Sequence, residues 1–156
     1  PGVADGPLGL SFSNDKQRRA RDLLEVRFMI EPQMARMAAE HATNDQVVCI
    51  KDLCDESERL AEAGEDYSAA DTAFHNAIAE SSGNLVVPRL MGVLKASVPL
   101  FIDVTGKKLV EETIRTHRGV ADAIAARNPT AAHDAMYLHL VYNRNMIAEG
   151  TQEQGE

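Results

Sequence analysis

Residues 71–75 read Asp71-Thr-Ala-Phe-His75 and place a carboxylate and an imidazole four residues apart. On a helix, positions i and i+4 lie on the same face, so both side chains point in one direction. The apolar residues Tyr67, Phe74 and Ile78 share that stripe, which turns it toward the interior. Two polar side chains buried together need a physical explanation, because their burial without partners is costly.

The same helical spacing of apolar residues recurs along most of the chain and predicts six helices, at about residues 15–41, 44–63, 66–82, 84–98, 107–127 and 129–149. Thr43 with Gln46 resembles a capping box, Gly64 ends the second helix, and Asn128-Pro129 opens the last one. The sequence therefore predicts an all-α fold, an antiparallel bundle of six, or seven, helices.

The start of the third helix decides whether Asp71 is available to a ligand. Ser68 and Asp71 have the spacing of a capping box, which would direct this carboxylate to backbone amides. Asp66 is an equally good cap nearer to Gly64, and it leaves Asp71 free to point inward. We therefore expect the helix to start at Asp66.

Two further histidines lie on stripes that face the core. His117 and His139 are twenty-two residues apart, and the turn at Asn128-Pro129 makes their helices antiparallel neighbours, so the two rings can lie at a similar height. Taken singly, each is an ordinary core histidine. Together with Asp71 and His75 they form a ligand set that suits Zn²⁺, with Ni²⁺ or Mn²⁺ as alternatives.

Two polar residues are candidates for contact with a bound carboxylate. Arg27 lies on the apolar stripe of the first helix, where it either pairs with Glu31 one turn on or holds a ligand carboxylate in bidentate fashion. Asn143 follows His139 by one turn and is a hydrogen-bonding group for a ligand hydroxyl. The sequence alone leaves both alternatives for Arg27 open.

The composition limits the classes of function. With 16 Lys+Arg against 24 Asp+Glu, the net charge of −8 argues against this chain being a DNA-binding surface by itself. Cys49 and Cys54 are too far apart along one helix for a disulfide, and unpaired cysteines are typical of a reducing cytoplasm. No apolar run is long enough for a membrane span. Residues 1–14 are rich in Gly and Pro and are interpreted as a linker, residues 15–150 as the helical domain, and 151–156 as a polar tail. We expect a fragment of a longer cytoplasmic protein.

Four motifs carry a resemblance to a known family; they are Arg27-x-x-x-Glu31-Pro32, Asp71-x-x-Phe74-His75 leading to Ser82-Gly83-Asn84, His117-Arg118 with Ala123-Ile124 behind it, and Ala135-Met136-x-x-His139-Leu140. In these motifs the chain resembles the FCD ligand-binding domain of GntR-type transcription regulators. The resemblance implies a helical bundle in which Asp71, His75, His117 and His139 hold a divalent metal, and a small carboxylate effector completes its coordination. It also implies a homodimer that reads DNA through an N-terminal winged helix-turn-helix, which this chain lacks.

A helical metal-dependent hydrolase is the alternative function. The adjacent His133-Asp134 pair and the His-rich interior suggest it, because a metal could activate water beside a carboxylate base. His133, however, lies about 120° around the helix from His139, so we expect it in solvent. The sequence offers no evident further interior carboxylate to act as the base. We therefore expect a sensor domain and not an enzyme.

Overall fold

The computed structural model describes residues 16–94 and 110–152. Within these ranges the chain forms helices α1 (Lys16–His41), α2 (Asn44–Glu62), α3 (Ser68–Glu80), α4 (Val87–Leu94), α6 (Val110–Ala125) and α7 (Pro129–Gln152), and none of the described residues is in a strand. The predicted all-α bundle is confirmed. Among the described helices, none is both long and apolar enough to cross a membrane.

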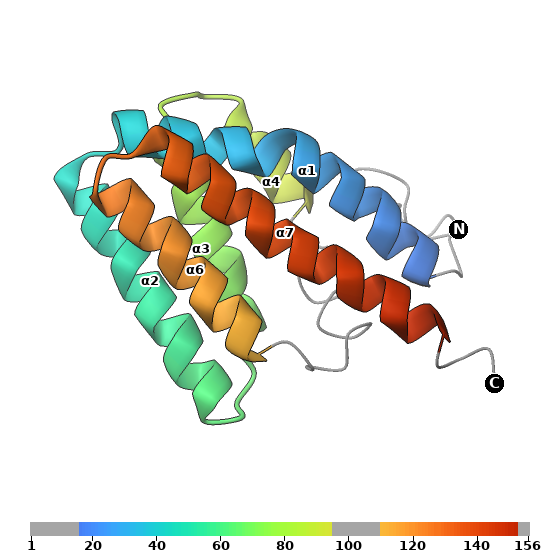
Figure 1. Ribbon diagram of the computed structural model, residues 1–156. Helices are drawn as coiled ribbons and strands as arrows, with labels where there is room; N and C mark the ends of the chain where they lie inside the picture. The colour runs from blue at the N-terminus through green and yellow to red at the C-terminus, as the bar shows by residue number, and fades with distance from the viewer. Residues whose placement is uncertain (1–15, 95–109, 153–156) are drawn as a thin grey trace, which may run out of the picture.

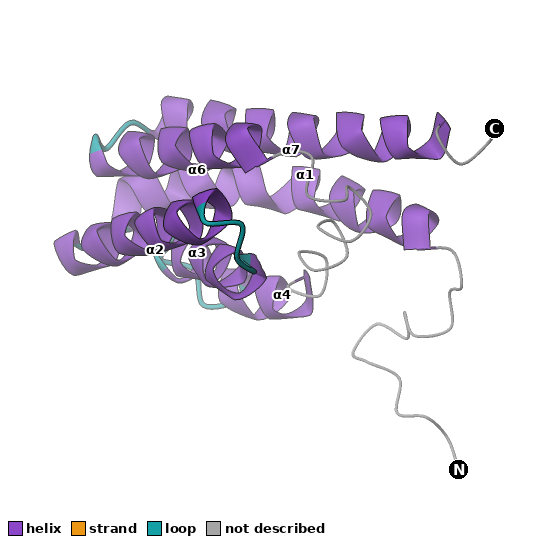
Figure 2. Ribbon diagram, turned by 90° about the horizontal axis from the view of Figure 1, so that it is seen from below, coloured by secondary structure: helices purple, strands orange, loops and turns teal. Residues whose placement is uncertain are grey.

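The helices form two layers around a shared core. Figure 1 shows α1 and α7 side by side and antiparallel, with α6 next to α7 and α2 beyond it. Figure 2 shows α3 and α4 on the other side of the bundle from α7. The centre of the core is built from large, fully buried side chains of five helices, Met34, Ile50, Phe74, Ile78, Ile124 and Met136. This packing brings α3, α6 and α7 together around one interior point.

Local capping explains most helix boundaries. The Thr43 hydroxyl accepts from the Gln46 N–H at 3.2 Å, and the Gln46 side chain accepts from the Thr43 N–H at 2.9 Å, which is the predicted capping box. Asn84 Oδ1 accepts from the N–H of Val87 at 3.2 Å, and Asn128 Oδ1 from that of Ala131 at 3.0 Å. Both predicted asparagine caps are therefore present.

Some predicted limits differ from the structure. The fourth helix begins at Val87, three residues later than expected, because Asn84 caps it through an extended turn. The last helix continues through Gly150 to Gln152, because a single glycine weakens a helix without ending it. Four predicted features lie outside the described residues. They are the end of the fourth helix at residue 98, the start of the fifth at residue 107, the linker 1–14 and residues 153–156 of the tail.

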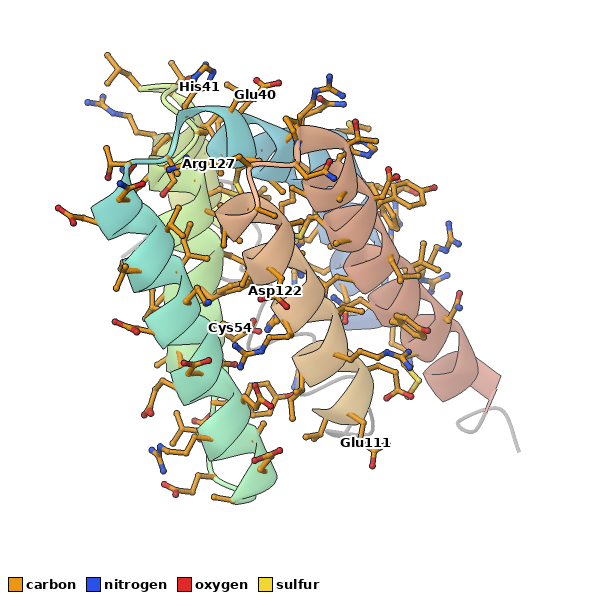
Figure 3. All side chains as sticks on the ribbon, turned by 60° about the vertical axis from the view of Figure 1, so that its left-hand side comes forward. Glu40, His41, Cys54, Glu111, Asp122 and Arg127 are labelled. Carbon is orange, nitrogen blue, oxygen red and sulfur yellow. The ribbon has the colours of Figure 1, made fainter. Side chains whose placement is uncertain are left out.

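Contacts of Arg127, directly after the C-terminal end of α6, tie that end to the start of α2. Arg127, after α6, has a positive φ of 55° and donates to the Ala42 carbonyl and, at 3.1 Å, to Asn44 Oδ1. Figure 3 shows Arg127 at the end of the bundle where Glu40 and His41 close α1, and Glu111 at the opposite end of α6. Cys54 and Asp122 lie along the seam between α2 and α6 in the same view, and burial raises the pKa of the Cys54 thiol to about 11.

Candidate metal centre

Helix α3 turns Asp71 and His75 into the interior. Asp66 Oδ1 accepts from the Ser68 N–H at 3.0 Å and from the Ser68 hydroxyl at 2.7 Å, so Asp66 supports the start of the helix although α3 begins at Ser68. The alternative capping box between Ser68 and Asp71 does not form. Asp71 is 6 % exposed and His75 is 2 % exposed, which agrees with the predicted inward face.

The other two predicted histidines come from α6 and α7. The ring centroids of His117 and His139 are 4.5 Å apart, and each is 5.3 Å from the ring of His75. Each ring presents a nitrogen within 4.8 Å of the nitrogens of the other two. Two ligands of one ion at about 2.1 Å can be at most about 4.2 Å apart, so small ring rotations would let the three imidazoles hold a metal ion.

Asp71 joins the three rings through His117. Its Oδ1 lies 3.2 Å from His117 Nε2, and both side chains are almost completely buried. Among the described buried atoms, both ring nitrogens of His75 and Nε2 of His117 lack an aligned hydrogen bond. Buried polar atoms normally have partners, so one nitrogen of each of these two rings is available to a bound ion. The structure thus gathers the three predicted histidines in one cluster and places Asp71 against one of them, His117.

The electrostatics favour the metal-binding form of two of the three histidines. Burial lowers the pKa of His117 and of His139 well below the usual range, and the neighbouring imidazoles and Arg27 act in the same direction. Both rings are therefore neutral near pH 7, and a neutral imidazole carries the lone pair that coordinates an ion. Burial raises the pKa of Asp71, while His75 and Arg27 oppose this effect.

Glu31 is an interior carboxylate that the sequence interpretation did not expect. It is completely buried, and its Oε2 lies 2.9 Å from His75 Nδ1, without the alignment of a hydrogen bond. Burial alone would raise the pKa of Glu31, but Arg27 and His75 hold it well below its usual range. The expectation that the interior offers no further carboxylate was wrong. Glu31 follows Arg27 by four residues and so shares its inward face, which could have indicated a buried carboxylate. That spacing was interpreted only as a salt bridge.

Arg27 and Asn143, the two predicted effector contacts, both lie beside the cluster. Arg27 is 2 % exposed, and its Nε and Nη2 donate to the two oxygens of Glu31 at 2.5 and 3.2 Å. The salt bridge, one of its two predicted roles, is therefore present. Asn143 is half-buried, and its Nδ2 lies 3.4 Å from Nε2 of His139. Its closeness to a predicted metal ligand is consistent with a contact to a molecule bound there.

The remaining histidines lie away from the cluster. His133 contacts Asp134 at 3.0 Å, stacks on Tyr137 and is partly exposed, as its position around the helix predicted. His41 is exposed at the end of α1, where the Cβ of a residue at Gly83 would lie 3.2 Å from its Cβ. Neither ring contributes to the interior site.

The fold and the cluster together define a helical domain with an interior site that could hold a metal ion. The family model of the FCD domain matches residues 22–142, which is most of the chain, and the chain belongs to this family. The family predicted from the four sequence motifs is thus confirmed.

The relatives are regulators of transcription. The chain is 31 % identical over 143 residues to the HTH-type transcriptional regulator LutR of Bacillus subtilis, covering 85 % of this chain and 64 % of LutR. An Escherichia coli protein provisionally named as a regulator of the L-lactate dehydrogenase operon is 34 % identical, with 85 % of this chain and 53 % of that protein covered. A solved structure, Streptococcus agalactiae GntR, superimposes with a TM-score of 0.80 at 33 % identity and covers 92 % of this chain and 67 % of that one.

The lengths and names of the relatives bear on the choice between sensor and enzyme. The chain spans about half to two thirds of the length of the curated relatives described here. These relatives are named as regulators and not as hydrolases, which agrees with the expectation of a non-enzymatic domain. Glu31 is a poor candidate for the base of a hydrolase, because its carboxylate is already paired with the guanidinium of Arg27.

Proposed function

We propose that this chain is the effector-sensing domain of a DNA-binding transcription regulator and that it binds one divalent metal ion and a small carboxylate. The observation that carries the proposal is the cluster of His75, His117 and His139 in the core, with Asp71 against His117 and with ring nitrogens of His75 and His117 that have no aligned hydrogen bond. Nitrogen-rich sites of this kind suit Zn²⁺, Ni²⁺ or Mn²⁺, and we expect Zn²⁺ first.

The metal would anchor the effector. Four protein ligands around a six-coordinate ion leave two positions, which suit a carboxylate and the hydroxyl on its neighbouring carbon. Two relatives are named for the L-lactate dehydrogenase operon and the galactonate operon, and both acids carry such a hydroxyl. We therefore propose α-hydroxy acids as the effector class, with Arg27 and Asn143 as the side chains nearest to the bound acid.

DNA would be read by another part of the full-length protein. The net charge of −8 makes this chain a poor surface for nucleic acid, and the relatives extend well beyond the region that it matches. A regulator of this design acts in the cytoplasm as a homodimer, because two symmetric copies match two DNA half-sites. Effector binding would then change the geometry between the copies.

Thermal unfolding with and without metal tests the proposal. A cognate α-hydroxy acid at a hundredfold excess over its Kd should stabilise the Zn²⁺-loaded protein by about 2.7 kcal/mol, and should do much less for chelator-treated protein. Asn143→Ala should reduce the stabilisation by the acid while leaving that by Zn²⁺. Equal stabilisation of the metal-free protein by the acid, or its consumption by the metal-loaded protein, would contradict the proposed role.

A further inference from the structure

Thr116 contacts a predicted metal ligand across the seam between α6 and α7. Its side chain is buried at 4 % exposure, and its Oγ1 lies 3.0 Å from Nδ1 of His139. Thr116 directly precedes His117 in the sequence but contacts the histidine of the neighbouring helix. No sequence pattern singled it out, because the contact depends on how α6 and α7 pack.

The direction of this hydrogen bond follows from the other partner of the hydroxyl. Thr116 Oγ1 donates to the Glu112 carbonyl at 2.7 Å, one turn earlier in α6. The Thr113 carbonyl is a second acceptor within reach, at 3.2 Å. A hydroxyl has a single proton, so while that proton goes to either carbonyl the oxygen accepts from the imidazole, and Nδ1 of His139 is then the protonated nitrogen.

The second ring nitrogen of His139 supports the same assignment. Asn143 Nδ2 lies 3.4 Å from His139 Nε2, and an amide nitrogen can donate but not accept. Nε2 is thus the nitrogen with the lone pair, and an ion bound to it would take the place of the Asn143 contact. Residues that bind the far nitrogen of a metal-bound histidine fix the tautomer and orientation of its ring.

We propose that Thr116 is a positioning residue of the metal centre, which holds His139 in the Nδ1-protonated tautomer and directs Nε2 to the ion. This inference rests on the proposed metal site. The hydroxyl acts through the ring and does not itself touch the metal. The tautomer is set before the ion arrives, so the metal-free protein should already show it.

Two substitutions separate positioning from packing. Thr116→Val keeps the shape of the side chain but removes the acceptor, and Thr116→Ser keeps the hydroxyl. Thr113→Val is the matched control, since Thr113 is a half-buried threonine on the same helix and the variant keeps its backbone carbonyl, which lies 3.2 Å from Thr116 Oγ1. Zn²⁺ affinity is measured by competition with a chelator, and the His139 tautomer by long-range ¹H–¹⁵N spectra of the metal-free protein.

We expect Thr116→Val to weaken Zn²⁺ binding about ten- to a hundredfold and to give a mixture of tautomers, whereas Thr116→Ser and Thr113→Val retain the wild-type values. An unchanged affinity and an unchanged tautomer in Thr116→Val would overturn the role of Thr116. If the wild-type protein takes up no Zn²⁺, the metal site itself is overturned. The two failures are therefore distinguishable.

Discussion

Arg27 and Glu31 form a buried ion pair next to the proposed metal site, so replacing Arg27 would affect the fold as well as any contact with the effector. Both side chains are buried. Glu31 also contacts Nδ1 of His75, a predicted metal ligand, so the ion pair helps to hold that ring in place. A carboxylate that contacts a metal-binding histidine orients the ring and raises its basicity. Arg27 thus has a structural role in addition to any contact with the effector.

Removing Arg27 should destabilise the fold. Arg27→Ala leaves Glu31 as a buried charge without its partner, and breaking such a pair costs about 3–5 kcal/mol of unfolding free energy. Urea unfolding of the metal-free protein measures this change. Arg36→Ala is the control, because Arg36 forms an exposed pair with Glu40 at 3.7 Å and should cost less than about 1 kcal/mol. Equal losses in the two variants would mean that the Arg27 pair is not buried in solution.

At the scale of helices, local signals in the sequence predicted the elements well. The capping box at Thr43, the asparagine caps at Asn84 and Asn128 and the inward face of α3 depend on residues close together in the chain. The positions of Glu31 and Thr116 beside the histidines depend on how α1, α6 and α7 pack, and spacing within one helix does not contain that information. The inward positions of the proposed ligands were predictable, but the positions of Glu31 and Thr116 beside them were not.

The capping box should contribute measurably to the stability of α2. Thr43→Ala removes the acceptor of the Gln46 N–H and should lower the unfolding free energy by about 1 kcal/mol. Thr43→Ser keeps a hydroxyl at the same position and should lie within a few tenths of a kcal/mol of the wild type. Chemical denaturation compares the three proteins. A Thr43→Ser protein as unstable as Thr43→Ala would show that the methyl group matters and the cap does not.

At the scale of the molecule, the outer faces of α1 and α7 offer a surface for the proposed dimer. The two helices pack side by side, and both expose large apolar side chains, with Met29 72 % and Leu138 46 % exposed. Sedimentation should find a dimer that Met29→Glu weakens. Val48→Glu is the control, since Val48 is 57 % exposed on α2 and lies outside this surface. A wild-type protein that sediments as a monomer at micromolar concentration would contradict dimerisation through this domain.

The proposed metal ion would join side chains from α3, α6 and α7 at the centre of the bundle, so its binding should affect the stability of the whole domain. If it is correct, Zn²⁺ should raise the unfolding temperature of the metal-free protein as ligand binding to the folded state requires. The histidines offer an internal comparison. His117 and His139 lie in the cluster, whereas His133 is on α7 with His139 but faces away.

The most direct test is a Zn²⁺ titration of four metal-free proteins, the wild type and the variants His117→Ala, His139→Ala and His133→Ala. We expect one tightly bound ion per wild-type chain, at least about tenfold weaker binding in His117→Ala and in His139→Ala, and wild-type binding in His133→Ala. A wild-type chain that binds no metal at neutral pH, or equal losses in all three variants, would contradict the interior metal centre.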